Sequence, residues 1–438
     1  MIPHRTGARA PSRAYENAGH ELIEQYRTVR ATTEALAEPL SDEDQGLQAM
    51  ASCSPTKWHL AHTTWFFETF LLEPLGVPAF DARWGYLYNS YYDAVGPRHA
   101  RHNRGLLSRP SAAQVADYRR AVDRHATRLM QGFGGDDWQQ WLPVVQLGLA
   151  HEQQHQELIL TDILNAFSAN PLLPAYRPAQ PEAVTTVATA PRSIQFIFHP
   201  GGLVEVGASH ATGFHFDNEG PRHRVWIEPF EIGDRLVTVA EWKAFADAGG
   251  YDTPSLWLSE GYEWVQTQSV RTPLYTRREG AALLVFGLGG EREALDGEPI
   301  TNVSYFEADA VARFLGARLP TEFEWELVAA PMPAEGRFLQ SGALRALPAP
   351  AQRNGEPVQL YGDAWEWTQS PYAPYPGYHP PPGALGEYNA KFMVNQMVLR
   401  GGSAFTPEGH MRASYRNFWP PATRFQLTGV RLARGAKA

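Results

Sequence analysis

The chain has 438 residues, of which 43% are hydrophobic and 19% charged, so it can form two or three folded domains and does not have the composition of a disordered protein. Its single cysteine, Cys53, excludes an internal disulfide and cysteine-rich zinc motifs. The net charge of −9 gives no electrostatic reason to expect nucleic acid or an anionic membrane as a partner.

The amino-terminal segment and the hydropathy of the chain bear on its location. Residues 1–20 are polar and contain no apolar core of signal-peptide length. No run of about 18 apolar residues occurs in the chain, so a membrane-spanning segment is not expected. We therefore expect a cytoplasmic protein that does not bind membranes.

The first 170 residues have helical periodicity. Helices are predicted at 14–37, 56–72, 111–130 and 138–167. Ser111 follows a proline and is suited to cap the third of them. Four helices of this length predict an antiparallel bundle. Residues 81–109, between the second and third helices, form a long loop rich in aromatic residues, and loops of that length are usually functional when they are ordered.

The second half of the chain has a different character. Residues 171–191 are rich in proline and alanine, and we interpret them as a linker. Short alternating apolar segments and many glycines follow. Strands are predicted at 203–206, 225–232, 283–286 and 397–400, and helices at 237–248 and 305–315. The expected division is a helical domain over residues 1–170 and an irregular α+β domain over residues 192–438.

The strongest chemical signal is the segment His151-Glu-Gln-Gln-His155 in the fourth predicted helix. Histidines at i and i+4 lie on one helix face, about 5–6 Å apart at Cβ, and can bind one metal ion together. The second helix offers a third ligand, because His59 and His62 both lie in it. Three imidazoles suit several first-row metals and leave positions open for substrates, which points to catalysis.

The same segment also matches the H-E-x-x-H pattern of zinc proteases, in which Glu152 would be the general base. The extended form of that pattern needs a glycine where this chain has Leu158. The region that would have to provide a downstream ligand is the proline-rich linker. A protease is therefore disfavoured. The plain alternative is that these histidines are structural residues of the bundle.

Several longer sequence motifs of this chain resemble those of a known family. Residues 54–68, which include Trp58-His-Leu-Ala-His62, and residues 151–157 resemble the two iron-binding helices of the sulfoxide synthases of ergothioneine biosynthesis. Motifs of the second half resemble formylglycine-generating enzymes, namely Leu319-Pro-Thr-Glu-Phe-Glu-Trp, Gly362-Asp-Ala-Trp-Glu-Trp, Leu399-Arg-Gly-Gly-Ser and Thr428-Gly-Val-Arg. The resemblance runs from about residue 15 to about residue 435. It implies a DinB-like four-helix bundle that carries the metal, followed by a formylglycine-generating-enzyme-like domain with a C-type-lectin-like fold.

The resemblance also implies a metal site. The iron(II)-binding positions of the family match His62, His151 and His155 in this chain. Glu157 would orient a ligand imidazole through a hydrogen bond. His59 is not at a ligand position in the family, and we interpret it as a packing residue or as a hydrogen-bond partner of a ligand.

The substrate implied by the resemblance is Nα-trimethylhistidine (hercynine), which binds the iron through its imidazole. Gln154, next to the second histidine of the helix, would position it. Asn417, Phe418 and Trp419 match a loop that shapes the pocket for the ammonium group. An aromatic wall suits a quaternary ammonium, because cation–π attraction provides roughly 0.5–2 kcal/mol.

The loop over residues 81–109 provides further candidates. Tyr91 and Tyr92 resemble the tyrosine pair of the family branch that uses free cysteine, and a phenol near iron can act as the catalytic acid. The alternative for both is loop packing. Arg101 and Arg104 are candidates for binding the carboxylate of the sulfur donor, because arginine binds carboxylates with two hydrogen bonds. The alternative is a solvated basic loop.

The implied reaction is the O2-dependent formation of a C–S bond between cysteine, or γ-glutamylcysteine, and C2 of the hercynine imidazole, with oxidation of the sulfur to a sulfoxide. Three alternatives stay open: a selenoneine synthase that joins a selenol donor, a selenosugar, to hercynine; an ovothiol-type synthase that acts on unmethylated histidine; and a non-catalytic binding protein with a structural metal. The second domain contains no cysteine, so formylglycine chemistry is not expected of it.

Overall fold

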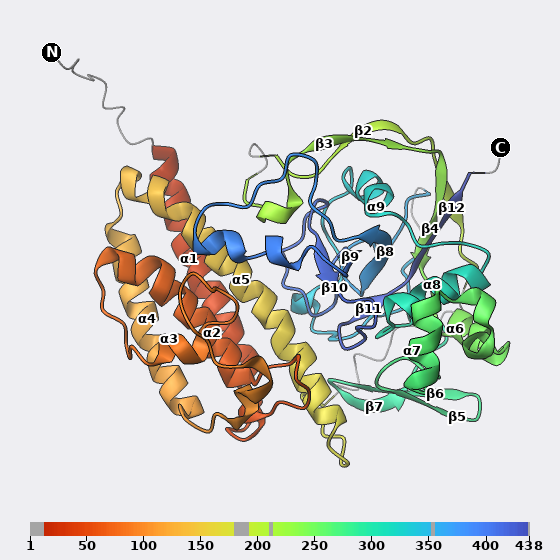
Figure 1. The fold of residues 1–438 in the computed structure, drawn as a ribbon, viewed down its shortest axis with the longest axis horizontal. Helices are drawn as coiled ribbons and strands as arrows, with labels where there is room; N and C mark the ends of the chain where they lie inside the picture. The colour runs from red at the N-terminus through yellow and green to blue at the C-terminus, as the bar shows by residue number, and fades with distance from the viewer. Residues whose placement is uncertain (1–12, 179–191, 210–212, 352–354, 437–438) are drawn as a thin grey trace. The chain divides into compact units, whose positions relative to one another are not determined.

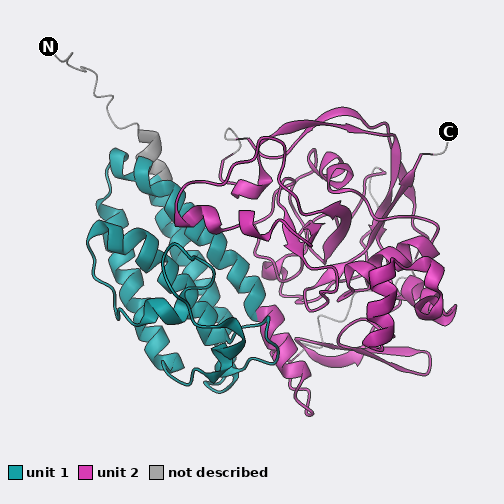
Figure 2. Ribbon diagram, in the orientation of Figure 1, with its two compact units in different colours: residues 1–159 teal, residues 160–438 magenta. Residues whose placement is uncertain are grey.

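The computed structural model describes residues 13–178, 192–209, 213–351 and 355–436. The chain divides into two compact units, residues 1–159 and residues 160–438 (Figure 2). The boundary between the two units lies inside a long helix. It precedes residue 170, which is the expected end of the first domain. Of the expected linker, residues 171–178 contain turns and no helix or strand, and residues 179–191 lie outside the described part of the chain.

Unit 1 is helical (Figure 1). Its helices are α1 (Arg13–Ala37), α2 (Thr56–Phe67), α3 (Trp84–Tyr88), α4 (Ala112–Gly132) and the first part of α5 (Gly135–Ser168). The four long ones correspond to the four helices predicted from the sequence. The short helix α3 and a 3-10 segment at Arg101–Leu106 lie within the predicted loop over residues 81–109.

Local sequence explains the ends of these helices. Ser111 caps α4 as predicted: its hydroxyl accepts the N–H of Gln114 at 3.2 Å, and the Gln114 side chain accepts the N–H of Ser111 at 3.0 Å. The second predicted helix is regular only to Phe67. Residues Glu68–Leu72 form one turn of π-helix, a feature that often marks functional regions.

Helix α2 has the central place in unit 1. It packs against both α1 and α4, and every one of its residues is buried. A helix that is covered on all sides holds its polar side chains away from water. The polar side chains of α2 therefore need protein partners, and its histidines are shielded from solvent.

Unit 2 combines short helices with small sheets (Figure 1). Its complete helices are α6 (Val239–Asp247), α7 (Ser259–Thr267), α8 (Tyr305–Phe314) and α9 (Glu322–Ala329). Its strands are β1 (Phe196–His199), β2 (Gly202–Val206), β3 (His223–Ile227), β4 (Phe230–Leu236), β5 (Thr276–Glu279), β6 (Ala282–Gly287), β7 (Gly290–Glu293), β8 (Trp365–Pro371), β9 (Met397–Arg400), β10 (Asn417–Trp419), β11 (Thr428–Gly429) and β12 (Arg431–Gly435).

The strands of unit 2 form four sheets in the described residues, with the orders β1-β4-β12, β10-β9-β8-β11, β2-β3 and β5-β6-β7. All pairs are antiparallel except β11 with β8. The single strand predicted at 225–232 is wrong: β3 ends at Ile227, and β4 begins at Phe230 in a different sheet. Pro229 lies at the break, and its missing N–H interrupts a strand ladder.

The core of unit 2 contains tryptophans and paired charges. Trp325, Trp365 and Trp367 are almost completely buried. Glu366 forms two hydrogen bonds with Arg431, at 2.7 and 2.8 Å, and accepts the indole N–H of Trp325 at 2.8 Å. These tryptophans are therefore core residues, and the charges among them are satisfied by one another.

No helix in the described part of the chain has the length and apolar character needed to cross a membrane.

Candidate metal centre

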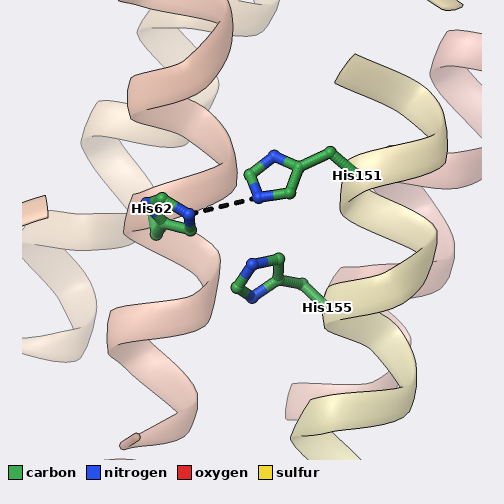
Figure 3. A group of neighbouring side chains, drawn as sticks. All are labelled: His62, His151 and His155. Carbon is green, nitrogen blue, oxygen red and sulfur yellow. Dashed lines mark hydrogen bonds between the residues drawn. The ribbon is translucent and has the colours of Figure 1, made fainter. Parts of the chain in front are cut away.

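Three histidines from two helices meet in the interior of unit 1. His62 lies on α2, and His151 and His155 lie one turn apart on α5. Their exposed fractions are 0, 1 and 8%. One ring nitrogen from each lies within 4.8 Å of the other two, and the three rings face one another (Figure 3). Among the described residues, this is the only group of three or more potential metal ligands.

The spacing of the ring nitrogens fits a single metal ion. Nε2 of His62 lies 3.2 Å from Nε2 of His151. Two nitrogens bound to one ion at about 2.0–2.1 Å are separated by about 2.8–3.4 Å for coordination angles between octahedral and tetrahedral. Three neutral imidazoles are a donor set that suits iron, zinc, copper or nickel. The residues present therefore fit a first-row metal.

Hydrogen bonds fix the orientation of two of these rings. Nδ1 of His62 donates to the backbone carbonyl of Tyr88 at 2.6 Å, which leaves the lone pair of the neutral ring on Nε2. Nδ1 of His155 lies 2.7 Å from Nδ1 of His59, which is also buried. His59 thus forms a hydrogen bond with a candidate ligand, which is one of the two roles that we expected for it. Such contacts hold ligand rings in place and usually affect metal affinity.

Aromatic rings cover both faces of His62. Its imidazole is stacked between Trp58, at 4.6 Å, and Trp65, at 5.6 Å. The guanidinium carbon of Arg104 lies 3.4 Å from the ring centroid of Trp58. Neither tryptophan was predicted to contact His62, although positions i−4 and i+3 relative to His62 share its helix face.

The two candidate arginines differ in their surroundings. Arg104 is only 2% exposed and donates to the hydroxyls of Ser54, at 2.9 Å, and Ser90, at 3.1 Å. Arg101 is exposed, and its backbone carbonyl accepts a hydrogen bond from Gln48. Arg104 therefore contacts Trp58, the ring that stacks on His62, whereas Arg101 lies at the surface.

Burial keeps the three histidines neutral. Desolvation lowers the pKa of His151 to about 3. Desolvation, together with the repulsion that protonated neighbouring histidines would exert, holds the pKa values of His62 and His155 well below the usual value. A neutral imidazole is the form that binds a metal. The rings are therefore ready to bind an ion at neutral pH without first losing a proton.

Glu152 does not have the environment of a protease base. It is fully buried, and its carboxylate pairs with Arg119 and with Arg30, whose Nη1 lies at 2.8 Å. Burial alone would raise the pKa of Glu152, but the two guanidiniums outweigh it and hold the pKa at about 2. A carboxylate this weakly basic, already used by two cations, does not activate a water molecule. The arrangement therefore excludes the zinc-protease alternative.

The tyrosine pair lies in the aromatic layer next to the histidines. Tyr92 is fully buried and packs against Trp65, at 5.7 Å between ring centroids, and against Phe70, at 5.1 Å. The half-buried Tyr91 packs on Tyr92 at 4.7 Å. Trp65 therefore contacts both His62 and Tyr92.

The remaining two candidates of unit 1 lie on α5. Gln154 is half-buried and directly precedes His155, whereas Glu157 is buried two residues beyond it. Positions i and i+2 do not share a helix face, so helix geometry turns Glu157 away from His155. The hydrogen bonds described above, which orient His62 and His155, come from Tyr88 and His59. The role of Glu157 in orienting a ligand stays a prediction.

The other substrate-binding candidates belong to unit 2. Asn417, Phe418 and Trp419 form β10, which pairs with β9, and all three are half-buried. Phe418 stacks on Tyr372 with 4.0 Å between ring centroids. The side-chain oxygen of Asn417 accepts the N–H of Phe418 at 2.8 Å. Their role at the ammonium group of the substrate stays a prediction.

Comparisons with known proteins agree with this architecture. The DinB superfamily model matches residues 25–159, and the model of the sulfatase-modifying factor enzyme 1-like domain matches residues 182–354 and 356–436. The class of protein is thus a DinB-like helical region followed by a formylglycine-generating-enzyme-like domain, which confirms the predicted fold class.

Full-length relatives narrow this class to one family. The hercynine oxygenase of Mycolicibacterium smegmatis is 32% identical over 95% of this chain and 99% of its own length. That of Mycobacterium tuberculosis is 34% identical over 87% and 91%. The formylglycine-generating enzyme of Streptomyces coelicolor is 29% identical over 54% of this chain and 88% of its own. The chain belongs to the hercynine oxygenase family, and it is an oxidoreductase with a metal cofactor.

Proposed function

We propose that this protein is a non-haem iron(II) sulfoxide synthase that uses O2 to join a thiol to C2 of the hercynine imidazole. The observation that carries the proposal is the cluster of His62, His151 and His155, whose ring nitrogens lie within 4.8 Å of one another. Its support is the similarity to hercynine oxygenases along nearly the whole chain. Three protein ligands leave up to three positions of an octahedral ion for two substrates and O2.

Iron held by the three histidines would supply binding positions for the substrates and the redox chemistry with O2. The protein residues would orient and shield this centre. The Tyr88 carbonyl and His59 hold the rings of His62 and His155 in fixed orientations. The stacked Trp58 and Trp65 exclude water from both faces of His62. A dry and rigid set of ligands favours the reaction of bound substrates over side reactions of oxygen.

The remaining candidates would bind the substrates or move a proton. Tyr91 or Tyr92 would act as the acid, because a neutral phenol can deliver one proton to reduced oxygen. Arg104 would bind the carboxylate of cysteine or of γ-glutamylcysteine, since its buried guanidinium lies next to the stack around His62.

Other predicted residues would bind or position hercynine. Gln154 would contact it near the metal, and Glu157 would help to orient a ligand ring. Asn417, Phe418 and Trp419 would surround its trimethylammonium group, where aromatic faces attract a cation.

The test is aerobic incubation of the iron-loaded protein with either hercynine or histidine and one donor at a time, namely cysteine, γ-glutamylcysteine or a selenosugar, with mass spectrometry as the readout. We expect a sulfoxide adduct with one of the two thiols. Exclusive formation of a C–Se product would identify a selenoneine synthase. An adduct with histidine but not hercynine would identify an ovothiol-type enzyme, and no product with any donor would contradict a catalytic role.

A further inference from the structure

A buried ionic cluster connects the helices around the three histidines. Glu152 is located between His151 and His155 in the sequence and is completely buried. One of its carboxylate oxygens accepts from Arg30 Nη1 at 2.8 Å. The other accepts from Arg119 Nη2 and from the hydroxyl of Thr33, the latter at 2.6 Å. The carboxylate of α5 is thereby connected to α1 and α4.

The same two guanidiniums also bind α2, at the residues that follow His62. Nη2 of Arg30 donates to the hydroxyl of Thr64 at 3.0 Å, and Nη1 of Arg119 donates to that of Thr63 at 3.4 Å. Each arginine therefore bridges α2 and α5, the two helices that carry the histidines. On both helices, the bridged residues are sequence neighbours of a candidate ligand.

We propose that this cluster, the Arg30–Glu152–Arg119 clamp, positions the metal ligands by setting the rotation and the separation of α2 and α5. The clamp residues do not touch the metal and act through the histidines beside them. The inference depends on one part of the proposed function, namely that His62, His151 and His155 bind a metal.

Metal coordination is sensitive to small movements of this kind. A rotation of α5 by about 10° would move an imidazole nitrogen by roughly 1 Å, since the Cα atoms lie about 2.3 Å from the helix axis and the side chain extends several Å further. Metal–ligand distances tolerate only about 0.2 Å. The directional hydrogen bonds of two guanidiniums to one carboxylate and two hydroxyls restrict such a rotation in a way that apolar packing does not.

Stability alone is a weak explanation for the clamp. The cost of removing charges from water largely offsets their attraction, so apolar side chains of similar volume often stabilise a core equally well. If the clamp serves only fold stability, an apolar replacement should leave metal binding unchanged. If the clamp positions the ligands, the same replacement should weaken metal binding. An apolar core would restore the stability of the bundle without restoring the geometry of the ligands.

The experiment uses the full-length, metal-free protein and three sets of substitutions. Glu152→Gln removes the charge of the clamp. The pair Thr63→Val and Thr64→Val removes only its bonds to α2. The triple variant Arg30→Met, Arg119→Leu and Glu152→Leu replaces the charges by apolar groups. Glu366→Gln is the matched control, because Glu366 is an equally buried carboxylate, paired with Arg431 in unit 2.

Three quantities are measured for each variant: the Tm of the metal-free protein, the Kd for iron(II) and cobalt(II) by competition with a chelator, and the visible absorption spectrum of bound cobalt(II), which reports ligand geometry. We expect the Kd to rise about 10- to 100-fold for Glu152→Gln and for the triple variant, with an altered cobalt spectrum. We expect the triple variant to recover the Tm, and the control to lower the Tm without changing the Kd.

The outcomes separate the clamp from the proposed function. If the wild-type protein binds metal and the triple variant or the threonine pair binds it with the same Kd and spectrum, the clamp has no positioning role. If the triple variant does not fold, the threonine pair decides, because it leaves the ion pairs intact. If the wild-type protein binds neither iron(II) nor cobalt(II), the proposed metal centre itself is wrong.

Discussion

Both units bury a carboxylate that accepts hydrogen bonds from guanidinium and other groups, but the neighbours of the two carboxylates differ. In unit 1, Glu152 is flanked by His151 and its partners extend to the residues after His62. In unit 2, Glu366 lies between Trp365 and Trp367 on β8, and its partner Arg431 also donates to the carbonyl of Gly233 on β4 at 2.8 Å. The first cluster joins helices that present ring nitrogens, whereas the second joins strands of the core.

This comparison shows that the chemistry of a buried ion pair does not by itself reveal its role. Each pair is buried and satisfied by hydrogen bonds. What distinguishes them is the side chains they hold in place. Substitutions in the two units should therefore separate metal binding from fold stability.

The largest effect is expected from His155→Ala. This change removes one of three imidazoles from a buried site, so we expect loss of bound metal and loss of turnover, with unit 2 still folded. Metal analysis and the product assay measure both. His410→Ala, which removes a buried histidine of unit 2, serves as the control and should retain metal. A His155→Ala protein with full metal content and full activity would show that the ligand assignment is wrong.

The next largest effect is expected in unit 2 from Glu366→Leu. It leaves the guanidinium of Arg431 buried without its carboxylate, which should cost about 3–5 kcal/mol of unfolding free energy. Urea denaturation followed by tryptophan fluorescence measures this loss. The double variant Glu366→Leu and Arg431→Leu should recover much of the stability. Both variants should keep the wild-type Kd for metal, and a weakened Kd would undermine the distinction between the two clusters.

Within unit 1, Arg104→Leu and Arg101→Leu should differ. Losing a hydrogen-bonded charge costs about 1.5–3 kcal/mol, so we expect the KM for the thiol donor to rise on the order of tenfold or more in Arg104→Leu. Arg101 is exposed, and its substitution should change the KM little. Steady-state kinetics with the donor varied gives both values. Equal effects of the two substitutions would count against a role of Arg104 in binding the donor.

A pH-dependent effect on stability is expected from His410. Burial, aided by the charge of Arg412, lowers the pKa of His410 to about 3. Because the unfolded chain has the ordinary value near 6.5, the unfolded state binds more protons at acidic pH. Stability is thus fully present above pH 6.5 and decreases as the pH falls toward 3, by up to about 1.4 kcal/mol per pH unit. His410→Gln should flatten this dependence in urea titrations between pH 7 and pH 4, and an unchanged slope would refute the assignment.

Much of the candidate centre was predictable because its signals are local in the sequence. The spacing of His151 and His155 places them on one helix face whatever surrounds the helix. The cap at Ser111 is an equally local effect of a hydroxyl at a helix start, and it was predicted correctly. The same periodicity places Trp58 and Trp65 on the helix face of His62, where they stack on its ring.

Other features lacked a local signal. The sequence offered Glu152 as a possible general base, because the pattern of a zinc protease also contains a glutamate at that position. Its partners Arg30 and Arg119 lie 122 and 33 residues away along the chain. In the same way, the sequence does not distinguish Arg101 from Arg104, because both lie in one basic loop. Only the folded loop buries the second and exposes the first.

By itself, the sequence determined the two-part architecture, the helices of the bundle and the residue types that meet in the centre. Helix periodicity, capping and long motifs depend on residues that are near one another in the chain. The tertiary structure decided which charged groups pair, which arginine is buried and why Glu152 is not a base. These outcomes depend on how helices pack, since a side chain's partners and its exposure to water are set by neighbours that are distant in sequence.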